Sequence, residues 1–348
     1  MIKREELFKS LTEAFGPSGF EKEVSEILKT YFSYVGEIVY DRLGSIICKR
    51  EKKGLKIMFA AHMDEVGFLV SKITKEGYVQ FLPIGGWYSQ VLLGSPVKIR
   101  TYKGDFLGVI GAKPPHELPE EERNKVIPIE KMYIDFGTFD GFDISKEFGI
   151  RIGDPIIPFF NYQKLPNNLH LGKAWDDRFG CAILCELGYA LKEIDHPNSI
   201  YLVGTCQEEV GLRGARTAAE FIKPDIAFAI DVSIARDYPG YSLKETPERL
   251  KNGCAIITYD VTMIPNIKLR DFVIEIAEKY SIKYHLTTIR GGYDTGAIHL
   301  KGIGVPSLAI GIPTRYIHSH CGIIAEEDYI ACLNLLIKIC ENLEDFSF

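Results

Sequence analysis

The sequence has no long hydrophobic run and no basic cluster. Although 46% of its residues are hydrophobic, every apolar run stays well short of the ~20 residues that a membrane-spanning helix needs. The formal net charge is −6, and lysine and arginine are not grouped as they are in proteins that follow nucleic-acid phosphates. The first residues, MIKREELFKSL, carry charges where a signal peptide has its apolar core. We therefore expect a cytoplasmic globular protein that binds neither membranes nor nucleic acid.

Paired cysteines are also missing. None of the eight cysteines belongs to a CxxC pair, which makes a thiolate metal site unexpected. Most of them lie in apolar runs, and Cys181 and Cys185 have helical spacing. We predict reduced cysteines in the core of a cytosolic protein. Their positions are 48, 181, 185, 206, 254, 321, 332 and 340.

The two ends of the chain have the pattern of an α/β domain. Before about residue 66, apolar residues recur at helical spacing on both sides of GPSG (16–19), and the run 55–61 is typical of a buried strand that ends at His62. After about residue 167, further strand-like runs alternate with helical patterns. The strand-like runs cover 199–204, 225–230, 254–260 and 305–313, and the helical patterns 179–191, 216–222, 266–280 and 328–343.

Residues 67–166 have a different texture. They consist of short β-type runs separated by glycine and proline, such as GYVQFLPIGG and SPVKIRTYKGDFLGVIGA, with almost no helical periodicity apart from the charged segment 119–125. We predict a three-layer α/β domain formed by residues 1–66 and 167–348. A separate β-domain is inserted between these two parts.

Acidic residues and histidines follow the predicted strands at the point where each strand ends. Because ligands of parallel α/β sheets bind beyond the carboxyl ends of the strands, we expect these side chains to converge at one edge of the sheet. A pair of aspartates precedes the first helix after the inserted segment. The complete set is His62, Asp64, Asp176, Asp177, Glu208, Glu209, Asp231, His318 and His320.

Histidines and carboxylates that are buried together are typical of a divalent-metal site. Adjacent Glu208 and Glu209 at the end of a buried strand are unfavourable unless a cation compensates them. Imidazole and carboxylate without thiolate suit Zn²⁺, Co²⁺ or Mn²⁺. One ion would leave too many carboxylates uncompensated, whereas two ions ~3.5–4 Å apart, bridged by one carboxylate, would compensate them. One glutamate would then bind a metal, and the other would act as general base.

The spacing of His62 and Asp64 adds a second argument. Alternate residues of a strand face the same way. The Asp64 carboxylate could therefore accept the second ring N–H of His62 and orient the imidazole.

Each of these features also has a simpler structural interpretation. His62 and Asp64 could be no more than hydrogen-bonding partners. Glu208 and Glu209 could be a solvated surface pair. Asp176 and Asp177 could cap the helix that follows them. Asp231 could be a turn residue, and His318 and His320 could be exposed in a loop. All five features fall after buried strands or at a helix start in one α/β domain, and this joint placement favours the metal site.

Six separated motifs resemble those of the TET and glutamyl aminopeptidase family of dinuclear metallopeptidases, in sequence and in order. GPSGFEKEV near the start and GDP before the return to the α/β pattern agree as well, so the resemblance covers nearly the whole chain. The six motifs are HMDEVGF (62–68), KAWDDRFG (173–180), QEEVGLRGA (207–215), AIDVS (229–233), GGYDTGAIHL (291–300) and PTRYIHS (313–319).

The resemblance implies a fold and an assembly. The fold would be a three-layer α/β/α metallopeptidase domain with a mixed sheet, and the inserted domain a small β-barrel-like dimerisation domain. Family members often assemble dimers into tetrahedral dodecamers that process short peptides, so a homo-oligomer with the dimer as its unit is expected.

The resemblance also implies roles for the motif residues. His62 and Asp231 would bind one zinc or cobalt ion, Glu209 and His318 the other, and Asp176 would bridge the two. Glu208 would be the general base for a water activated by the metals, and Asp64 would orient His62. The peptide bond between Asp176 and Asp177 would be cis. Gly292, Tyr293 and Asp294 would lie near the substrate, with Tyr293 in place of a smaller residue.

Three other functions remain open beside this aminopeptidase. A glycoside hydrolase needs two carboxylates around a sugar and usually aromatic platforms, yet the chain has only two tryptophans, at 87 and 175. A metal-dependent deacylase could use the same site, and a binding protein could have lost activity. The first-residue specificity, the metal, the oligomeric state and any role of His320 also stay open. Arg178, Arg290 and His116 could contact substrate or a neighbouring subunit, although a structural role is expected for each, and a contribution of His116 to the site stays open.

Overall fold

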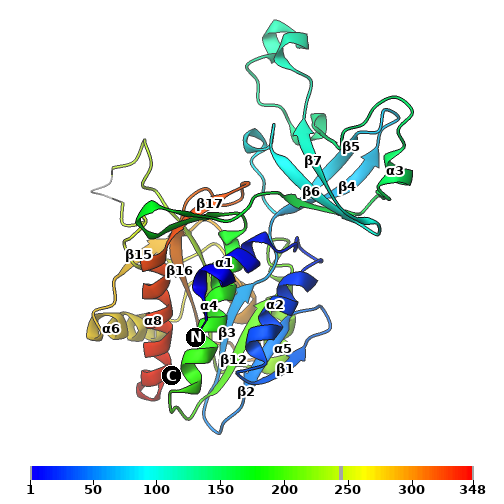
Figure 1. The fold of residues 1–348 in the computed structure, drawn as a ribbon. Helices are drawn as coiled ribbons and strands as arrows, with labels where there is room; N and C mark the ends of the chain where they lie inside the picture. The colour runs from blue at the N-terminus through cyan, green and yellow to red at the C-terminus, as the bar shows by residue number, and fades with distance from the viewer. Residues whose placement is uncertain (1, 243–245, 347–348) are drawn as a thin grey trace.

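An eight-stranded mixed sheet forms the centre of the larger part of the molecule. The structure, a computed structural model, describes residues 2–242 and 246–346. The strand order is β1-β2-β12-β3-β13-β16-β14-β15 (Figure 1). Strands β12, β3, β13 and β16 are parallel, whereas β2 and β14 run antiparallel to them. The strands are β1 Glu37–Tyr40, β2 Ile46–Arg50, β3 Lys56–His62, β12 Ser199–Thr205, β13 Ile226–Ile234, β14 Cys254–Tyr259, β15 Tyr284–Thr288 and β16 Ser307–Thr314.

Helices cover both faces of this sheet, which confirms the three-layer prediction. The strands are apolar on both faces, as buried parallel strands are. Phe59 and Phe228 stack at 5.3 Å in the core shared with one set of helices, while Met58 and Ala60 belong to the core on the other face. The first set is α1 Arg4–Glu13, α2 Lys22–Phe32, α4 Trp175–Lys192, α6 Ile267–Lys279 and α8 Glu326–Asn342, and the second is α5 Arg213–Ile222 and α7 Thr295–Ile298.

The inserted segment forms a closed six-stranded barrel with its own core. Figure 1 shows it projecting to one side of the α/β part. Alternate residues such as Val97 and Ile99 point into the barrel, where they meet Phe68 and Ile134. The barrel-like sheet was predicted, and its dimerising role stays a prediction. The strands are β4 Gly67–Ile73, β5 Val79–Ile84, β6 Pro96–Thr101, β7 Gly104–Gly111, β8 Tyr133–Asp135 and β9 Pro155–Pro158.

Short elements account for the differences from the sequence prediction. The charged segment 119–125 contains only a 3₁₀ turn at Glu120–Glu122, and the barrel also carries the short helix α3 Ile144–Glu147. The hairpin β1–β2, strand β15 and a three-stranded sheet were not predicted. Elements of three to five residues are too short to show a clear hydrophobic period. The small sheet contains β10 Gln163–Leu165, β11 Leu169–Gly172 and β17 Gly322–Ala325.

The predicted burial of the cysteines is confirmed for seven of the eight. All eight cysteines have free thiols, and all except the half-buried Cys321 are buried. Within the described residues, no helix combines the length and apolar character needed to cross a membrane.

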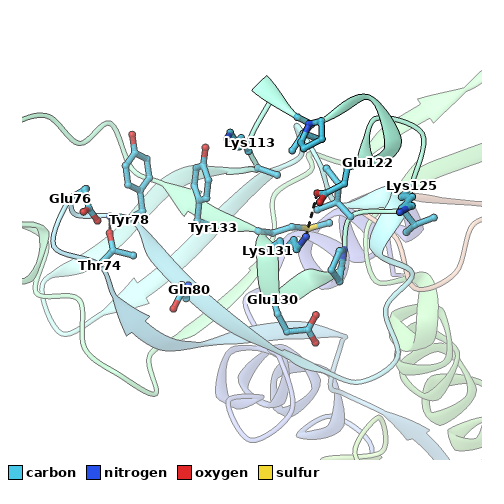
Figure 2. A pocket seen from close by; sticks show the side chains of 17 residues that line it. Thr74, Glu76, Tyr78, Gln80, Lys113, Glu122, Lys125, Glu130, Lys131 and Tyr133 are labelled. Carbon is cyan, nitrogen blue, oxygen red and sulfur yellow. Dashed lines mark hydrogen bonds and ion pairs between the residues drawn. The ribbon is translucent and has the colours of Figure 1, made fainter. Parts of the chain in front are cut away.

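The barrel contains a hollow of about 860 Å³ that lies apart from the predicted site residues (Figure 2). Three lysines and three glutamates line it, together with Tyr78 and Tyr133. One lysine and one glutamate of the lining form a direct ion pair, since Lys131 Nζ lies 3.6 Å from Glu122 Oε2. The hollow therefore has equal numbers of lysines and glutamates, in contrast to a lining of one sign.

Candidate metal centre

The predicted site residues arrive at one edge of the large sheet. Strand β3 ends at His62, and the loop after β12 carries Glu208 and Glu209. Asp231 lies within β13, which extends four residues beyond the predicted strand, and His318 follows β16. Parallel strands place their carboxyl ends together, so these side chains converge as expected. Asp176 joins them from the start of α4.

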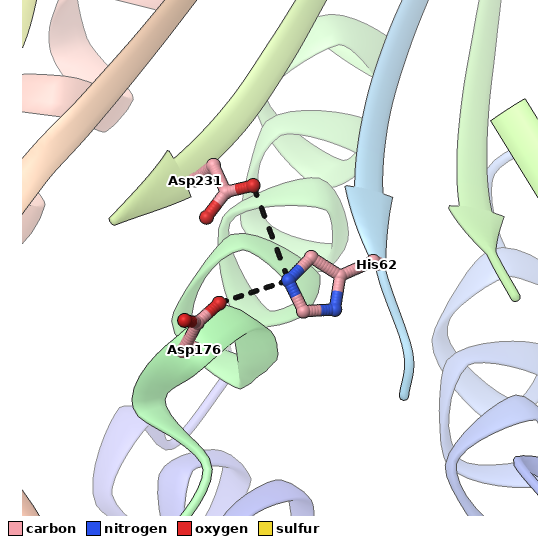
Figure 3. A group of neighbouring side chains, drawn as sticks. All are labelled: His62, Asp176 and Asp231. Carbon is pink, nitrogen blue, oxygen red and sulfur yellow. Dashed lines mark hydrogen bonds and ion pairs between the residues drawn. The ribbon is translucent and has the colours of Figure 1, made fainter. Parts of the chain in front are cut away.

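His62, Asp176 and Asp231 form the first group of potential ligands (Figure 3). His62 Nε2 lies 2.9 Å from Asp176 Oδ1 and 3.9 Å from Asp231 Oδ2. One ligand atom of each residue lies within 4.8 Å of the others. His62 and Asp231 are 2% and 5% exposed, so an ion held here would be largely shielded from solvent.

Asp176, Glu209 and His318 form the second group. His318 Nε2 lies 3.2 Å from Asp176 Oδ2 and 3.3 Å from Glu209 Oε2. Asp176 thus directs Oδ1 toward the first group and Oδ2 toward the second. A carboxylate in this position can bridge two ions.

The adjacent Asp177 has a different task. The Asp176–Asp177 peptide bond is cis, as expected from the family resemblance. Asp177 Oδ1 accepts a hydrogen bond from Gly180 N at 3.1 Å, and Oδ2 accepts one from His62 N at 3.1 Å. Both interpretations of the aspartate pair therefore apply, because one member faces the centre and the other caps the helix.

Asp64 supports the site differently from the prediction. Its carboxylate Oδ1 lies 3.7 Å from His62 Nδ1, and the backbone carbonyl of Asp64 is closer, at 3.0 Å. The carboxylate instead accepts hydrogen bonds from the backbone N–H groups of Glu208 and Glu209, at 2.9 and 3.1 Å. It also accepts one from Ser18 Oγ at 2.6 Å. The prediction that the Asp64 carboxylate bonds the His62 ring is therefore wrong; the carboxylate fixes the loop that carries both glutamates.

Glu208 lies beside the two ligand groups without belonging to either. Its Oε2 is 3.9 Å from His62 Nε2, and its side chain lines a cleft that opens beside the centre. A carboxylate in this place can exchange a proton with a molecule bound in the cleft.

The centre contains more negative charge than its histidines can compensate. Burial raises the pKa of Asp231, Glu208 and Glu209, and the neighbouring carboxylates add to the effect. Burial alone would lower the pKa of His62, but the charge of Glu208 and the contacts with Asp176 and Asp231 raise it well above its usual value. Glu209 Oε1 is buried without a hydrogen-bond partner. Divalent cations would compensate these groups and favour their ionised forms.

The histidine of the second group has a similar environment. Burial alone would lower the pKa of His318, but hydrogen bonds to Asp176 and Glu209 raise it to about 11. This shift has the same origin as that of His62, since both imidazoles face carboxylates that have no other cationic side chain beside them among the lining residues.

A cleft of about 370 Å³ adjoins the centre. Gly292 and Tyr293 line it, as predicted for the substrate end. Asp294 is 2% exposed, is not part of the wall, and accepts a hydrogen bond from Thr205 Oγ1 at 2.5 Å. Its role near the substrate therefore stays a prediction. The lining residues are Asp176, Glu208, Glu209, Gly211, Leu212, Asp231, Val232, Ile234, Thr262, Ile289, Gly291, Gly292, Tyr293, Ile317 and His318.

Several supporting residues were not identified from the sequence. Glu21 Oε1 accepts hydrogen bonds from Gly19 N at 2.7 Å and Gln207 N at 3.0 Å, so the GPSG segment and the glutamate loop are tied together. The barrel contributes Gly85, where a Cβ atom would lie 3.1 Å from Glu209 Oε2 and where φ is +74°. The glycines of GPSGFE and PIGGW could have indicated these two segments, because glycine often marks a place where the backbone approaches another group closely.

The residues left open by the sequence lie away from the ligand groups. Arg178 is buried and its Nη1 donates to Leu11 O at 2.6 Å, which is a structural role. His116 and Arg290 are exposed. His320 packs against Trp87 with a ring separation of 5.9 Å, and burial lowers its pKa to about 4.

Comparison with known sequences gives matches along almost the entire chain. The family model described as M42 glutamyl aminopeptidase matches residues 44–335. The glutamyl aminopeptidase of Lactococcus lactis subsp. cremoris is 36% identical over 341 residues, which cover 96% of this chain and 95% of the relative. The lysyl aminopeptidase of Pyrococcus furiosus is 32% identical over 351 residues, which cover 99% and 98%.

Solved structures agree with these matches. A TET aminopeptidase from a marine-sediment archaeon of the Thaumarchaeota has a TM-score of 0.95 and 44% identity, with 98% of this chain and 96% of that chain covered. The Pyrococcus horikoshii TET1 peptidase is described as assembling into a tetrahedron or a large octahedral shell. Its TM-score is 0.85 and its sequence identity 30%, with 97% of this chain and 99% of that chain covered. A Thermotoga maritima protein described as an endoglucanase has a TM-score of 0.78 and a sequence identity of 28%, with 97% of each chain covered.

Proposed function

This chain belongs to the M42 glutamyl aminopeptidase family and is an aminopeptidase, and from this premise we propose that it removes the N-terminal residue of short peptides with the help of two divalent ions. The observation that carries the proposal is the position of Asp176, which directs one carboxylate oxygen toward each of two ligand groups. Each group adds one histidine and one further carboxylate to this shared residue.

The residues fit two ions of the zinc or cobalt type. His62 and Asp231 would hold one ion and Glu209 and His318 the other, with Asp176 as the shared ligand. Imidazole and carboxylate without thiolate are the donors that these ions accept. The unpartnered Oε1 of Glu209 and the raised pKa of Asp231 both support a cation in this place.

When bound, the ions would polarise the peptide carbonyl and make a water acidic enough to lose a proton near neutral pH. Glu208 would accept this proton and return it to the departing amine, as its position beside His62 and on the cleft wall allows. Asp64 would keep Glu208 in place through the backbone N–H at 2.9 Å. The carboxylates at the end of the cleft would attract the free α-ammonium group of a peptide.

We also propose that the chain assembles through its barrel. The outer face of the barrel exposes apolar side chains at Leu82, Leu107 and Val109, which are 59%, 55% and 42% exposed. Exposed apolar side chains on one part of a protein are frequent at contacts between copies. A dimer would be the unit, and a tetrahedral dodecamer is a larger assembly to be tested by light scattering. The eight free thiols support a cytoplasmic location.

The test of the proposed activity starts from metal-stripped protein. We expect it to release no p-nitroaniline from a panel of aminoacyl-p-nitroanilides and to recover activity on addition of Zn²⁺ or Co²⁺. Matched N-acetylated substrates should stay intact, because they lack the free amine. Release of acetate from the acetylated compounds, without p-nitroaniline, would indicate a deacylase, and chelator-insensitive cleavage of cellulose oligomers would indicate a glycosidase. No release with either ion, for any residue, would contradict the proposal.

A further inference from the structure

The geometry points to a preference of this aminopeptidase for apolar N-terminal residues such as leucine or methionine over glutamate and lysine. The inference rests on the proposed function, because it assigns the cleft beside the metal centre to the side chain of the first residue. The wall of this cleft away from the centre decides which side chain fits.

The wall is made of aliphatic groups. Five aliphatic side chains line it, with two adjacent glycines and the ring of Tyr293. Ile234 is 38% exposed and Ile289 is 9% exposed, so both present apolar surface toward the hollow. A side chain placed here would be desolvated among methyl and methylene groups. The five are Leu212, Val232, Ile234, Ile289 and Ile317.

The two polar groups of the wall already have partners. Tyr293 Oη donates a hydrogen bond to Val232 O at 2.8 Å. Thr262 Oγ1 donates one to Asp260 Oδ1 at 2.5 Å. Neither hydroxyl hydrogen is left to bind a substrate carboxylate. A polar substrate side chain would thus exchange water for apolar contacts.

Within the part of the chain that the structure describes, the wall of the cleft offers no partner for a negatively charged substrate side chain. Among the described residues that line the cleft there is no lysine or arginine. A glutamate side chain would enter without a lysine or arginine to pair with, and its carboxylate would lose water against an apolar wall. Arg290 follows Ile289 in the chain, but it is exposed and does not line the cleft.

A lysine side chain would lack a partner at the far end of the cleft. One carboxylate outside the metal centre is that of Asp260, which lies behind Thr262 and is 1% exposed. Its Oδ1 also accepts hydrogen bonds from Thr262 N and Met263 N, at 2.7 and 2.9 Å. Asp260 would have to be uncovered before it could meet an ammonium group, whereas an apolar side chain needs no such change.

The test compares kcat/KM of the metal-loaded protein for leucyl-, methionyl-, glutamyl- and lysyl-p-nitroanilide. We expect leucine or methionine to exceed both charged residues by on the order of 100-fold, since apolar pockets discriminate by about 10–200-fold for single groups. The variant Ile234→Lys adds a cation to the wall at a partly exposed position. It should reduce the ratio of leucine to glutamate at least tenfold, while Ile234→Met should leave the preference for apolar residues intact.

Ile303→Lys is the matched control, because Ile303 is 108% exposed and lies outside the cleft. It should leave all ratios unchanged. Calorimetric binding of free leucine, glutamate and lysine gives a second readout that needs no turnover, and leucine should bind most tightly. If nothing is released but leucine still binds best, the proposed function fails and only the apolar character of the cleft is retained. Release with a preference for glutamate overturns the inference while the aminopeptidase stands, and a preference for lysine overturns it in favour of Asp260.

Discussion

Two buried charged clusters lie side by side along this chain, and only one of them calls for an added ion. The compensated cluster consists of Glu65, Lys173 and Arg178. The metal centre consists of the two ligand groups together with Glu208. Both clusters draw on the same two segments, because Glu65 follows Asp64, and Lys173 and Arg178 flank Asp176.

The compensated cluster satisfies its charges within the protein. Lys173 Nζ lies 2.6 and 2.7 Å from the two carboxylate oxygens of Glu65, and Arg178 Nη2 lies 3.1 Å from Oε1. Lys173 Nζ and Arg178 Nη2 also donate to the carbonyl oxygens of Ala14 and Gly16. One carboxylate thus has two cationic partners.

The metal centre shows the opposite balance. Four carboxylates, those of Asp176, Glu208, Glu209 and Asp231, face the imidazoles of His62 and His318. The larger hollow of the barrel, lined by three lysines and three glutamates, has no such excess. Buried charge or cavity volume alone would therefore not locate the site, whereas uncompensated buried charge does.

The largest expected effect is on turnover, through Glu208→Gln. An amide cannot accept the proton, so we expect kcat to fall by about 10²–10⁴-fold. The metal content should not change, since Glu208 belongs to neither ligand group. Steady-state kinetics measures the fall in kcat, and elemental analysis measures the metal content. Glu220→Gln, on the exposed face of α5, should behave like the unchanged protein. A fall of less than tenfold in the Glu208 variant would remove it from the role of base.

The next effect is on folding, through Glu65→Gln in the compensated cluster. The change leaves Lys173 and Arg178 buried without a carboxylate, so the free energy of unfolding should drop by about 3–5 kcal/mol. Urea denaturation of both proteins in a chelator measures this without any contribution from metal binding. Glu6→Gln removes an exposed contact with Lys3 at 2.9 Å and should cause no measurable change. A loss below ~1 kcal/mol for Glu65→Gln would mean that the cluster does not depend on its carboxylate.

A smaller effect should appear as a pH dependence. Burial lowers the pKa of Lys173 to about 8, against the attraction of Glu65, while the unfolded chain keeps ~10.4. Between about pH 8 and 10 the unfolded state therefore binds the proton that the folded state has lost, and the free energy of unfolding rises with pH. The rise is at most about 3 kcal/mol. The difference in unfolding free energy between the unchanged protein and Lys173→Met should grow across this window; a difference that shrinks would show that Glu65 outweighs burial.

The smallest effect concerns the support of the centre, through Ser18→Ala. It removes the hydrogen bond to Asp64 Oδ2 at 2.6 Å, which should lower the free energy of unfolding by about 1.5 kcal/mol. Turnover should fall only a few-fold, because Asp64 still accepts the two backbone N–H groups of the glutamate loop. Thermal unfolding and kinetics measure both, with Ser33→Ala on an exposed hydroxyl as control. An unchanged stability would mean that Ser18 does not hold Asp64.

The positions of most candidate ligands could be predicted from the sequence because they lie in or just after the last residues of buried strands of one sheet. His62 ends β3, His318 follows β16, and the edge where they meet is a property of parallel strands. The role of Asp64 could not be predicted in this way. It lies two residues beyond the end of β3, where the alternation of a strand no longer applies, and its carboxylate turns toward the glutamate loop.

The supporting contacts could not be predicted because they join residues far apart in the chain. Ser18 meets Asp64 across 46 positions, and Glu21 meets Gln207 across 186. The same holds for the cleft wall, where Leu212 comes from the start of α5, Ile234 from the end of β13 and Ile289 from the loop after β15. Local periodicity carries no information about such pairings.

The number of ions bound per chain tests the central claim most directly. Equilibrium dialysis of the metal-stripped protein against Zn²⁺, followed by elemental analysis, should give two ions per chain. In Asp176→Asn, which keeps the shape of the shared ligand but removes its charge, the count should fall to one or none. The hollow of the barrel should not add to the count. One ion or none in the unchanged protein, or two ions that persist in the variant, would contradict the assignment of Asp176 as the bridge between two metal positions.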